Sequence, residues 1–439
     1  MTMKKRLMIL LLTTLTVGMD AHAAPALKAK LAPGATEAQA QDVAAQAQAA
    51  TGNAATVVRD PSTGKVLSVI VNLPQAGPGN DTAASKLAAN NGVATVNIVI
   101  PATDAASLTA ALQQAATSQF TTVDLQADID MMTPAPRTGP AVTTLTGHIN
   151  GNGHTISNFS SDSPFVGSML SGSSIENLKL DSLNVSATDA SLASLSGGFG
   201  GLVASVSWNT TGTAISNVSL TNATVSCLTS QCGYTHVGGL VGVAMGWSPL
   251  TISKSSFSGA VNGSAGAANA GSGMGVGGIV GLNYYSAIVT DSYAKGSISG
   301  NLVGGLGGYM IGGSFTNSYF SGSISAVGNL TQAGGLVGSD GSWSTNCFAN
   351  LTSVPGTGKH GLIAGYAQGA YSNIEVTGPA SVLDPTLGMT WNGSARSFSS
   401  TEGRIASSMT QVHTDVINPN FSSTIWNIDP AGLAEPTLK

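Results

Sequence analysis

A short glycine-led phrase returns along the middle of this chain. The glycine before its Leu or Ile stands at positions 201, 239, 278, 305, 335 and 361, so successive copies are 38, 39, 27, 30 and 26 residues apart. Self-similarity at such intervals is typical of repeats that stack into an array. A repeat of this kind constrains shape, whereas function has to be argued from particular sites.

A second pattern follows each copy, as in Phe315-Thr316-Asn317-Ser318-Tyr319-Phe320. Its alternation of apolar and polar residues is typical of a strand with one buried face. One unit alone cannot bury that face, but successive coils stacked in parallel about 4.8 Å apart can. We therefore predict that residues 120–380 form a stacked parallel array. Its phase-matched inward residues are Leu202, Leu240, Ile279, Leu306 and Leu336.

The paired glycines in each phrase have two explanations. Either the chain turns tightly at each copy with a positive φ, or its backbone lies too close to the next coil for a Cβ atom.

The first residues resemble an export signal. Lys4-Lys5-Arg6 precede an apolar stretch from Leu7 to Val17, and Ala21-His22-Ala23 is a small-x-small cleavage site. We therefore expect residues 1–23 to be removed. The apolar run is too short to favour a membrane span, and no later stretch is long enough, so we expect a protein that does not span the membrane.

Two small segments precede the array. Residues 24–80 predict an α/β module and linker, with a helix from Glu37 capped by Thr36, strands at 54–59 and 65–72, and a linker at 74–79. Residues 81–119 predict a helix, a strand and a second helix that begins after a cap at Thr103. This second helix is expected to cover the open end of the array, and residues 381–439 to close the other end.

Composition excludes several classes of function. Only 8% of the residues are charged, the net charge is −5, and the chain has five Arg, so no basic stripe is present for nucleic acid. Three Cys occur. Cys227 and Cys232 are close enough in sequence to form a disulfide in an oxidising compartment, whereas Cys347 is expected to be a buried apolar thiol.

The residues also carry a resemblance to a known family. The Gly-Gly-Leu-Val-Gly phrases resemble the GLUG repeats of bacterial surface and secreted proteins, which include adhesins and regions of IgA-specific metallopeptidases. Residues 145–178 are similar to the segment that often precedes such repeats, and residues 421–428 and 436–439 to their closing segment. The resemblance covers residues 120–439 and implies a right-handed parallel β-helix, so the expected fold class is an all-β solenoid with a small α/β module and a capping helix.

The array contains few side chains that could act in catalysis. Between residues 200 and 370 the only acidic residues are Asp291 and Asp340, and Arg is absent; the basic side chains are Lys254, Lys295, Lys359, His236 and His360. General acid–base catalysis needs paired groups within reach of each other. We therefore predict no catalytic residue and no cofactor.

The densest polar group is the first-coil cluster, which consists of Asp124, Asp128, Asp130, His148 and His154. The two histidines with Asp128 could bind a metal, but the geometry of a tight corner also explains the Asn-Gly-Asn-Gly sequence around them. We predict a structural role here and no metal site.

The function that we expect is that of a secreted or surface-exposed, adhesin-like and non-catalytic protein that binds glycan or a host or matrix protein. Aromatic residues on a polar flank would form the contacts; they are Trp208, Trp247, Tyr284, Tyr285, Tyr309, Trp343 and Tyr366. The alternative is a carbohydrate-active enzyme, a polysaccharide lyase or glycoside hydrolase. A dedicated secretion partner and a periplasmic location are further alternatives.

Overall fold

The computed structural model describes most of the chain after the predicted signal peptide. The described residues are 24–132, 135–192, 195, 197–206, 212–229, 232–233, 235–246, 249–263, 274–285, 287–327, 332–353, 359–367, 370–378, 389–391, 394–396 and 403–439. The predicted signal peptide 1–23 and two of the predicted binding aromatics, Trp208 and Trp247, lie outside them. The described chain forms two compact units, one up to Thr103 together with Phe120–Asp124, and one of Asp104–Gln119 and Leu125–Lys439.

The first unit is a four-stranded antiparallel sheet with two helices. In chain order its elements are β1 (Ala26–Leu31), α2 (Glu37–Thr51), β2 (Ala55–Arg59), β3 (Val66–Asn72), α3 (Pro78–Ala88) and β4 (Val93–Ala102). The pairings β2–β3, β3–β1 and β1–β4 are all antiparallel. This order and direction are those of a ferredoxin-like β-α-β-β-α-β arrangement.

Local sequence signals account for part of this unit. Thr36 caps α2 in a reciprocal capping box with Gln39, and Gly52 ends the helix in the left-handed conformation. Strand β1 was not predicted from the sequence, and the boundary predicted after residue 80 falls between strands of one sheet. The reason is that the Pro-Gly-rich stretch at 74–79 contains Pro78, which begins α3 at a position where proline suits a helix start.

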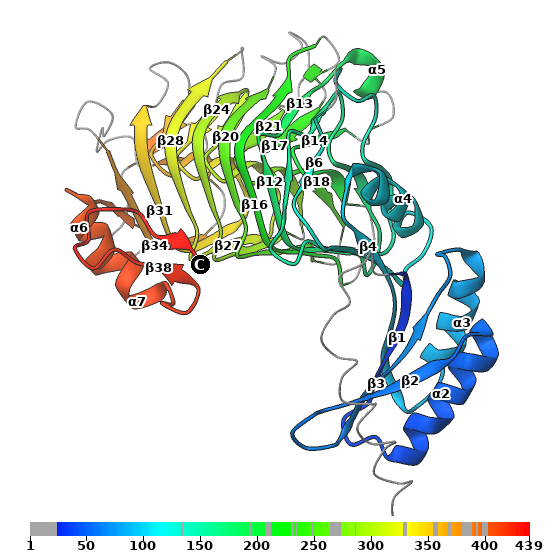
Figure 1. Ribbon diagram of the computed structural model, residues 1–439. Coiled ribbons are helices and arrows are strands. Elements are labelled where there is room, and N and C mark those ends of the chain that lie inside the picture. The colour runs from blue at the N-terminus through cyan, green and yellow to red at the C-terminus, as the bar shows by residue number, and fades with distance from the viewer. Residues whose placement is uncertain are drawn as a thin grey trace, which may run out of the picture. The chain divides into compact units, whose positions relative to one another are not determined.

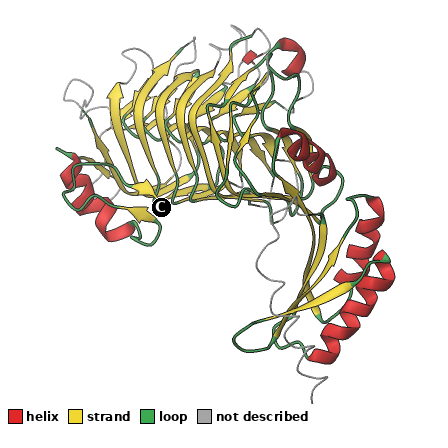
Figure 2. Ribbon diagram, viewed as in Figure 1, coloured by secondary structure: helices red, strands yellow, loops and turns green. Residues whose placement is uncertain are grey.

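The second unit consists mainly of parallel strands (Figures 1 and 2). One sheet contains ten strands, namely β7 (Val142–Leu145), β11 (Val166–Met169), β15 (Val203–Val206), β18 (Val241–Met245), β22 (Val280–Tyr284), β26 (Gly307–Met310), β30 (Val337–Asp340), β33 (Ala364–Ala367), β35 (Met389–Trp391) and β36 (Ser394–Arg396). A second contains six, namely β14 (Gly198–Gly200), β17 (His236–Gly238), β21 (Gly275–Gly277), β25 (Leu302–Gly304), β29 (Gln332–Gly334) and β32 (Lys359–Gly361).

The third and largest sheet alternates short and long strands along the chain. Its early strands are β6 (Ile129–Asp130), β8 (His148–Asn150), β9 (Thr155–Ser157), β10 (Ser160–Ser161), β12 (Ser174–Asp181), β13 (Asn184–Ser186) and β16 (Ala214–Cys227). Its later strands are β19 (Thr251–Ser253), β20 (Ser256–Gly263), β23 (Ile288–Thr290), β24 (Tyr293–Gly300), β27 (Ser314–Thr316), β28 (Tyr319–Ala326), β31 (Trp343–Ser353), β34 (Ala370–Thr377) and β37 (Gly403–Ile405). Figure 1 shows β16, β20, β24, β28 and β31 side by side in this order.

Successive coils are in register, as the repeat predicts. The five inward residues Leu202, Leu240, Ile279, Leu306 and Leu336 each have an exposed fraction of 0%. The backbone N–H of each donates to a carbonyl of the following coil, at 2.8 to 3.1 Å, so the five form one stacked column. The prediction of these buried positions is confirmed.

The prediction of an open right-handed parallel β-helix is wrong. The parallel strands of the largest sheet, with extra strands added to them, form a closed, barrel-like structure. Large apolar side chains of this unit such as Phe199, Phe257 and Phe315 are fully buried. A repeat determines which strands are equivalent and parallel, but the way their faces close depends on side chains that meet from different strands.

The glycines of the repeated phrase lie against the backbone of the next coil. A Cβ atom on Gly239 would collide with the carbonyl oxygen of Gly278, one on Gly278 with that of Gly305, and one on Gly335 with that of Leu362. None of these three glycines has a positive φ. Of the two explanations for the glycine pairs, close approach between coils is therefore the one that applies at these positions.

The remaining elements are β5 (Thr121–Leu125) and the helical and closing segments. Helix α4 (Ala105–Ala115) begins at Asp104, which forms the cap that was predicted at Thr103, and its last turn accepts hydrogen bonds from Thr146 and Gly147 at the first coil. A short helix, α5, covers Asp189–Leu192. The C-terminal segment contains α6 (Met409–Val412), a π-helical turn (His413–Ile417), α7 (Asn418–Asn420), β38 (Trp426–Asn427) and β39 (Thr437–Leu438). No helix in the described part of the chain is long and apolar enough to cross a membrane.

The coil contact predicts the effect of a single methyl group. Gly239→Ala should lower the free energy of unfolding by about 1–3 kcal/mol, because the added Cβ overlaps a backbone oxygen that cannot move without its whole coil. Thermal and denaturant unfolding measure this loss. Gly341→Ala is the matched control, since its Cβ would meet Met310 at an ordinary 3.5 Å; equal stability of the two variants would contradict the interpretation.

Candidate functional site

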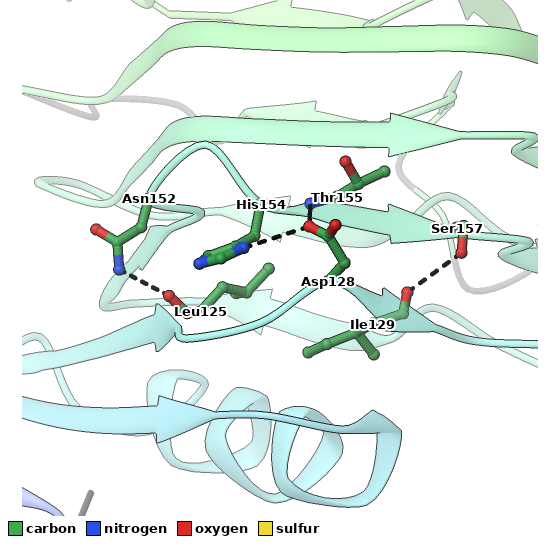
Figure 3. Close-up of polar contacts among 7 residues, drawn as sticks. All are labelled: Leu125, Asp128, Ile129, Asn152, His154, Thr155 and Ser157. Atoms are coloured by element: carbon green, nitrogen blue, oxygen red, sulfur yellow. Dashed lines mark hydrogen bonds and ion pairs between the residues drawn. The ribbon is translucent and has the colours of Figure 1, made fainter. Parts of the chain in front are cut away.

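The first-coil cluster is built around one pair, Asp128 and His154 (Figure 3). The carboxylate of Asp128 accepts from the backbone N–H of Thr155 at 2.8 Å and lies 3.3 Å from Nδ1 of His154. These hydrogen bonds, first from Thr155 and then from His154, lower the pKa of the Asp128 carboxyl. Because Asp128 immediately precedes β6 and Thr155 begins β9, the pair ties two paired strands together.

The other members of the cluster also hold strand ends. Asp130 accepts from the side-chain amide of Asn158 and from the backbone of Met132, both at 2.9 Å. Nδ1 of His148 lies 2.9 Å from the hydroxyl of Ser174 on the neighbouring strand, and burial lowers the pKa of this histidine. Asp124 belongs to the first compact unit.

The structure therefore does not assemble the predicted residues into a metal centre. His148 and His154 have different partners, on β12 and beside β6 respectively. Within the described residues no group of three or more His, Cys, Asp or Glu side chains could hold a metal ion. Asn152 completes the corner by donating to the carbonyl of Leu125 at 2.7 Å (Figure 3).

A ladder of amide side chains runs along the corner between the short and long strands. The ladder residues are Asn177, Asn217, Lys254, Asp291, Asn317, Asn346 and Asn373, and all have φ between 48° and 54°. Asn is enriched in this left-handed conformation, and the side-chain amides bond from coil to coil at 2.9 to 3.4 Å. Lys254 and Asp291 are the two residues that depart from Asn.

Asp291 has structural partners. Its Oδ1 accepts from Asn317 Nδ2 in the ladder and from Trp426 Nε1 of the C-terminal segment, each at 3.4 Å. His236 is half-buried and accepts from the backbone of Gly275 at 2.9 Å, and desolvation lowers its pKa to about 4, so it is neutral at pH 7. The side chains of Asp340, Lys359 and His360 lie outside the described residues.

The cysteines are arranged as follows. Cys227 and Cys232 form a disulfide. Cys347 is free and buried, and burial raises the pKa of its thiol to about 12, so it is not a thiolate at pH 7.

One corner of the second unit exposes apolar side chains from two coils, with Ser314 of the coil between them in register. Tyr285, Ile288 and Trp343 have exposed fractions of 44%, 38% and 63%. Ile288 lies in register with Ser314, and Ser314 with Trp343, so these residues form one column across the short strands. Gly312 of the next coil lies against the backbone of Tyr285, where an added Cβ would come within 3.0 Å of the Tyr285 Cα atom. We call these three residues the exposed corner.

The backbone of the exposed corner is held in an unusual conformation. Tyr285 has φ of 82°, which is an outlier for a bulky side chain. The buried Asn283 closes this turn: its Oδ1 accepts from Ala287 N at 2.8 Å, and its Nδ2 donates to the carbonyls of Ala287 and Gly312. Tyr284 packs edge-on against Tyr285, with 4.7 Å between ring centroids. Strain held by surrounding bonds in this way is typical of functional positions.

The other two predicted binding aromatics are less exposed. Tyr309 and Tyr366 are half-buried, and Tyr309 stacks on His236 with 6.5 Å between the ring centroids. Of the seven predicted aromatics, Tyr285 and Trp343 are therefore the exposed ones among those whose side chains the structure describes.

The C-terminal segment covers an aromatic column that the sequence did not indicate. Tyr293, Tyr319 and Phe348 stack with centroid distances of 5.0 and 4.6 Å, and Trp426 and Phe421 pack against them. Beside this stack, Lys295 Nζ lies 2.9 Å from Glu435 and over the rings of Tyr293 and Tyr319. Asn350 Nδ2 donates to the same carboxylate at 2.6 Å.

A pocket of about 690 Å³ opens beside this ion pair. Its polar lining includes Lys295, Asn350, Ser407, Ser408 and Glu435. Because Lys295 and Glu435 neutralise each other, the pocket offers hydroxyl and amide groups and no free pair of carboxylates for hydrolysis.

Comparison with known proteins agrees with the repeat. Residues 272–299 match the family model of the GLUG motif. The chain carries a GLUG motif. The matched segment includes β21 to β24 and contributes Tyr285 and Ile288 to the exposed corner, and also Asp291 and Lys295. A β-rich chain with a GLUG motif is compatible with a surface or secreted protein.

A solved structure is also similar to this GLUG-containing chain. It is a protein of Bacteroides ovatus described as a candidate immunoglobulin A1 protease, 16% identical over 78% of this chain and 92% of the other, with a TM-score of 0.48. This likeness is too weak to carry a conclusion about fold or activity. Among curated proteins no match is found.

The Lys295–Glu435 pair predicts a pH-dependent contribution to stability. Burial raises the pKa of the Glu435 carboxyl, but hydrogen bonds from Ser321, Asn350 and Lys295 outweigh burial and hold the pKa below its ordinary value of 4.5. Stability from this group is therefore fully present above about pH 4.5 and lost as the pH falls through the lowered pKa. Glu435→Gln should cost about 1–2 kcal/mol at pH 7, and the difference from the natural protein should shrink below pH 4.5.

Unfolding in denaturant across this pH range measures the effect. A double-mutant cycle with Lys295→Met separates the pair from other contacts of Glu435. Additive losses in the double variant would show that the two side chains do not stabilise each other.

Proposed function

We propose that this protein is a secreted or surface-exposed, adhesin-like protein that binds glycan through the exposed corner without catalysis. The observation that carries the proposal is the column of Ile288, Ser314 and Trp343 with Tyr285 beside it, in which aromatic and apolar groups face solvent on a surface otherwise rich in hydroxyls. Three of the seven exposed large apolar side chains among the described residues lie at this one corner.

The chemistry of the corner favours sugar over protein as the ligand. Pyranose rings present flat apolar faces edged with hydroxyls, and aromatic rings beside polar groups suit such faces. Thr290, Thr316 and Thr345 are in register on the same strands. They form a second column beside that of Ile288, Ser314 and Trp343, and they supply its hydroxyl groups. Protein interfaces are typically anchored by large side chains that insert into pockets. The exposed corner differs from that arrangement, because its apolar groups lie beside a row of hydroxyls.

Non-catalytic binding is supported by the state of the titratable groups. In the described part of the array, Asp291 is held by an amide and an indole, and His236 accepts from the backbone of Gly275. Neither lies in a pair of the kind that acid–base hydrolysis requires.

The location is part of the same proposal. Export would depend on residues 1–23, with the periplasm as the alternative to the cell surface or the medium, and a dedicated secretion partner would be needed for passage beyond it. Fractionation of cells that produce the natural chain and a variant with Lys4, Lys5 and Arg6 replaced by Gln tests this directly.

Binding to a glycan array and affinity electrophoresis in polysaccharide gels test the ligand. Trp343→Ala should weaken glycan binding at least tenfold, about 1.4 kcal/mol, while unfolding is unchanged because the ring is largely in water. Tyr285→Gly should also weaken binding without loss of stability, since glycine adopts a positive φ freely.

Met132→Ala is the matched control, because Met132 is equally apolar and 74% exposed but lies away from the corner. Binding that survives both corner substitutions would contradict the proposal. Binding to matrix proteins but to no glycan would favour the protein ligand instead, and release of reducing sugar or unsaturated uronide would favour the carbohydrate-active enzyme.

A further inference from the structure

A second pocket lies where the C-terminal segment passes the amide ladder. It has a volume of about 350 Å³, and its lining includes Asn217, Lys254, Ile425, Leu438 and Lys439. This volume is within the range of small-molecule sites. Its lining has two lysines and no acidic side chain, in a chain whose net charge is −5.

The pocket coincides with the break in the ladder at Lys254. Asn217 Nδ2 donates to Asn177 Oδ1 at 2.9 Å, and the next bonded step begins again from Asn317 to Asp291. Lys254 keeps the left-handed backbone of the ladder, with φ of 49°, although lysine is not favoured there. A residue that departs from the repeat at a local cost is a candidate for function.

The break leaves two polar groups free toward the pocket. Within the described chain the ammonium of Lys254 has no ion-pair or hydrogen-bond partner, and the carboxylate of the adjacent ladder residue, Asp291, accepts from Asn317 and Trp426. The side-chain oxygen of Asn217, which would accept from the next amide in an unbroken ladder, has no donor among the described residues. Together they offer one cation and one neutral acceptor.

The remaining lining residues provide hydroxyl groups, which suit the polar edge of a sugar ring, and apolar surface, which suits its face. The hydroxyls of Ser216 and Ser253 lie in adjacent coils, one residue before the ladder, while Ile425 and Leu438 add apolar surface from the C-terminal segment. Thr251 and Ser253 alternate with the buried Ile252 on β19, so they share one face of the strand, and Thr251 lies in register with Ile288 of the exposed corner. The pocket and the corner therefore lie on the same face of the short strands.

We propose that this pocket binds the carboxylate-bearing sugar of an acidic glycan, with Lys254 recognising the carboxylate and Asn217 accepting from a sugar hydroxyl. The sugar part of this inference rests on the proposed glycan binding, whereas the anionic part rests on Lys254 and the ladder break. Two acidic side chains lie close by in sequence register, Asp291 as the ladder neighbour of Lys254 and Glu176 in register with Ser216, and both lie outside the lining of the pocket.

Titration calorimetry with tetragalacturonate tests the proposal on the full chain. Lys254→Asn removes the charge and supplies the residue that the ladder and its positive φ favour, so the variant should be at least as stable as the natural protein. We expect it to bind tetragalacturonate at least tenfold more weakly. Lys65→Asn, an exposed lysine in a turn of the first unit, makes the same change of net charge and should bind normally.

Two further probes separate the parts of the inference. Fully methyl-esterified tetragalacturonate should bind the natural protein and Lys254→Asn equally, because its charge is gone. Unchanged binding of tetragalacturonate to Lys254→Asn would overturn the proposal, and inorganic sulfate binding as tightly as tetragalacturonate would overturn its sugar part.

Failure of the proposed function gives a different result. If Trp343→Ala leaves binding of the esterified probe intact while Lys254→Asn abolishes the preference for the charged one, the exposed corner is refuted and the Lys254 site stands. If Trp343→Ala weakens the esterified probe and Lys254→Asn affects neither probe, the exposed corner stands and the Lys254 site is refuted.

Discussion

The second unit depends on the contact between a glycine of one coil and a backbone carbonyl of the next. At Gly239, Gly278 and Gly335 no Cβ fits, so the coils approach as closely as their hydrogen bonds allow. Leu202 and its equivalents can then stack in one buried column while the backbone N–H groups beside them are satisfied by the following coil. Apolar burial and hydrogen bonding thus both require the same small residue at the same place.

The C-terminal segment covers an aromatic surface that the stacking of equivalent strands creates. Tyr293, Tyr319 and Phe348 are equivalent residues on successive strands, and stacking places them in a continuous aromatic column on the outer face. Left uncovered, such a column would be a surface for association with other molecules. Trp426 and Phe421 cover it, and the Lys295–Glu435 pair and the bond from Trp426 to Asp291 give the cover polar specificity.

The two proposed binding regions share a physical origin, since each is a local departure from a regular corner. In the ladder, Asn side chains satisfy one another from coil to coil, and Lys254 interrupts them. At the exposed corner, Tyr285 occupies a backbone conformation that a bulky residue seldom adopts, which the hydrogen bonds of Asn283 maintain. The regular repeats form a rigid framework, and the residues that depart from the repeat, Lys254 and Tyr285, present their side chains to solvent.

The sequence by itself determined which residues are equivalent between coils. The spacing of the glycine phrase and the alternation around it were sufficient to predict the parallel register and the burial of Leu202, Leu240 and Ile279, because both follow from local periodicity. The cap of α2 at Thr36 was likewise readable, since a capping box is local.

Only the tertiary structure decided how the faces close and where sites form. The closed, barrel-like arrangement and the pairing of β1 between β3 and β4 depend on contacts between segments far apart in the chain. The same is true of the candidate sites: His148 and His154 are near in sequence but take separate partners, while Glu435 meets Lys295 across 140 residues. Periodicity specifies which residues repeat, whereas long-range packing specifies which side chains meet, and binding sites depend on the latter.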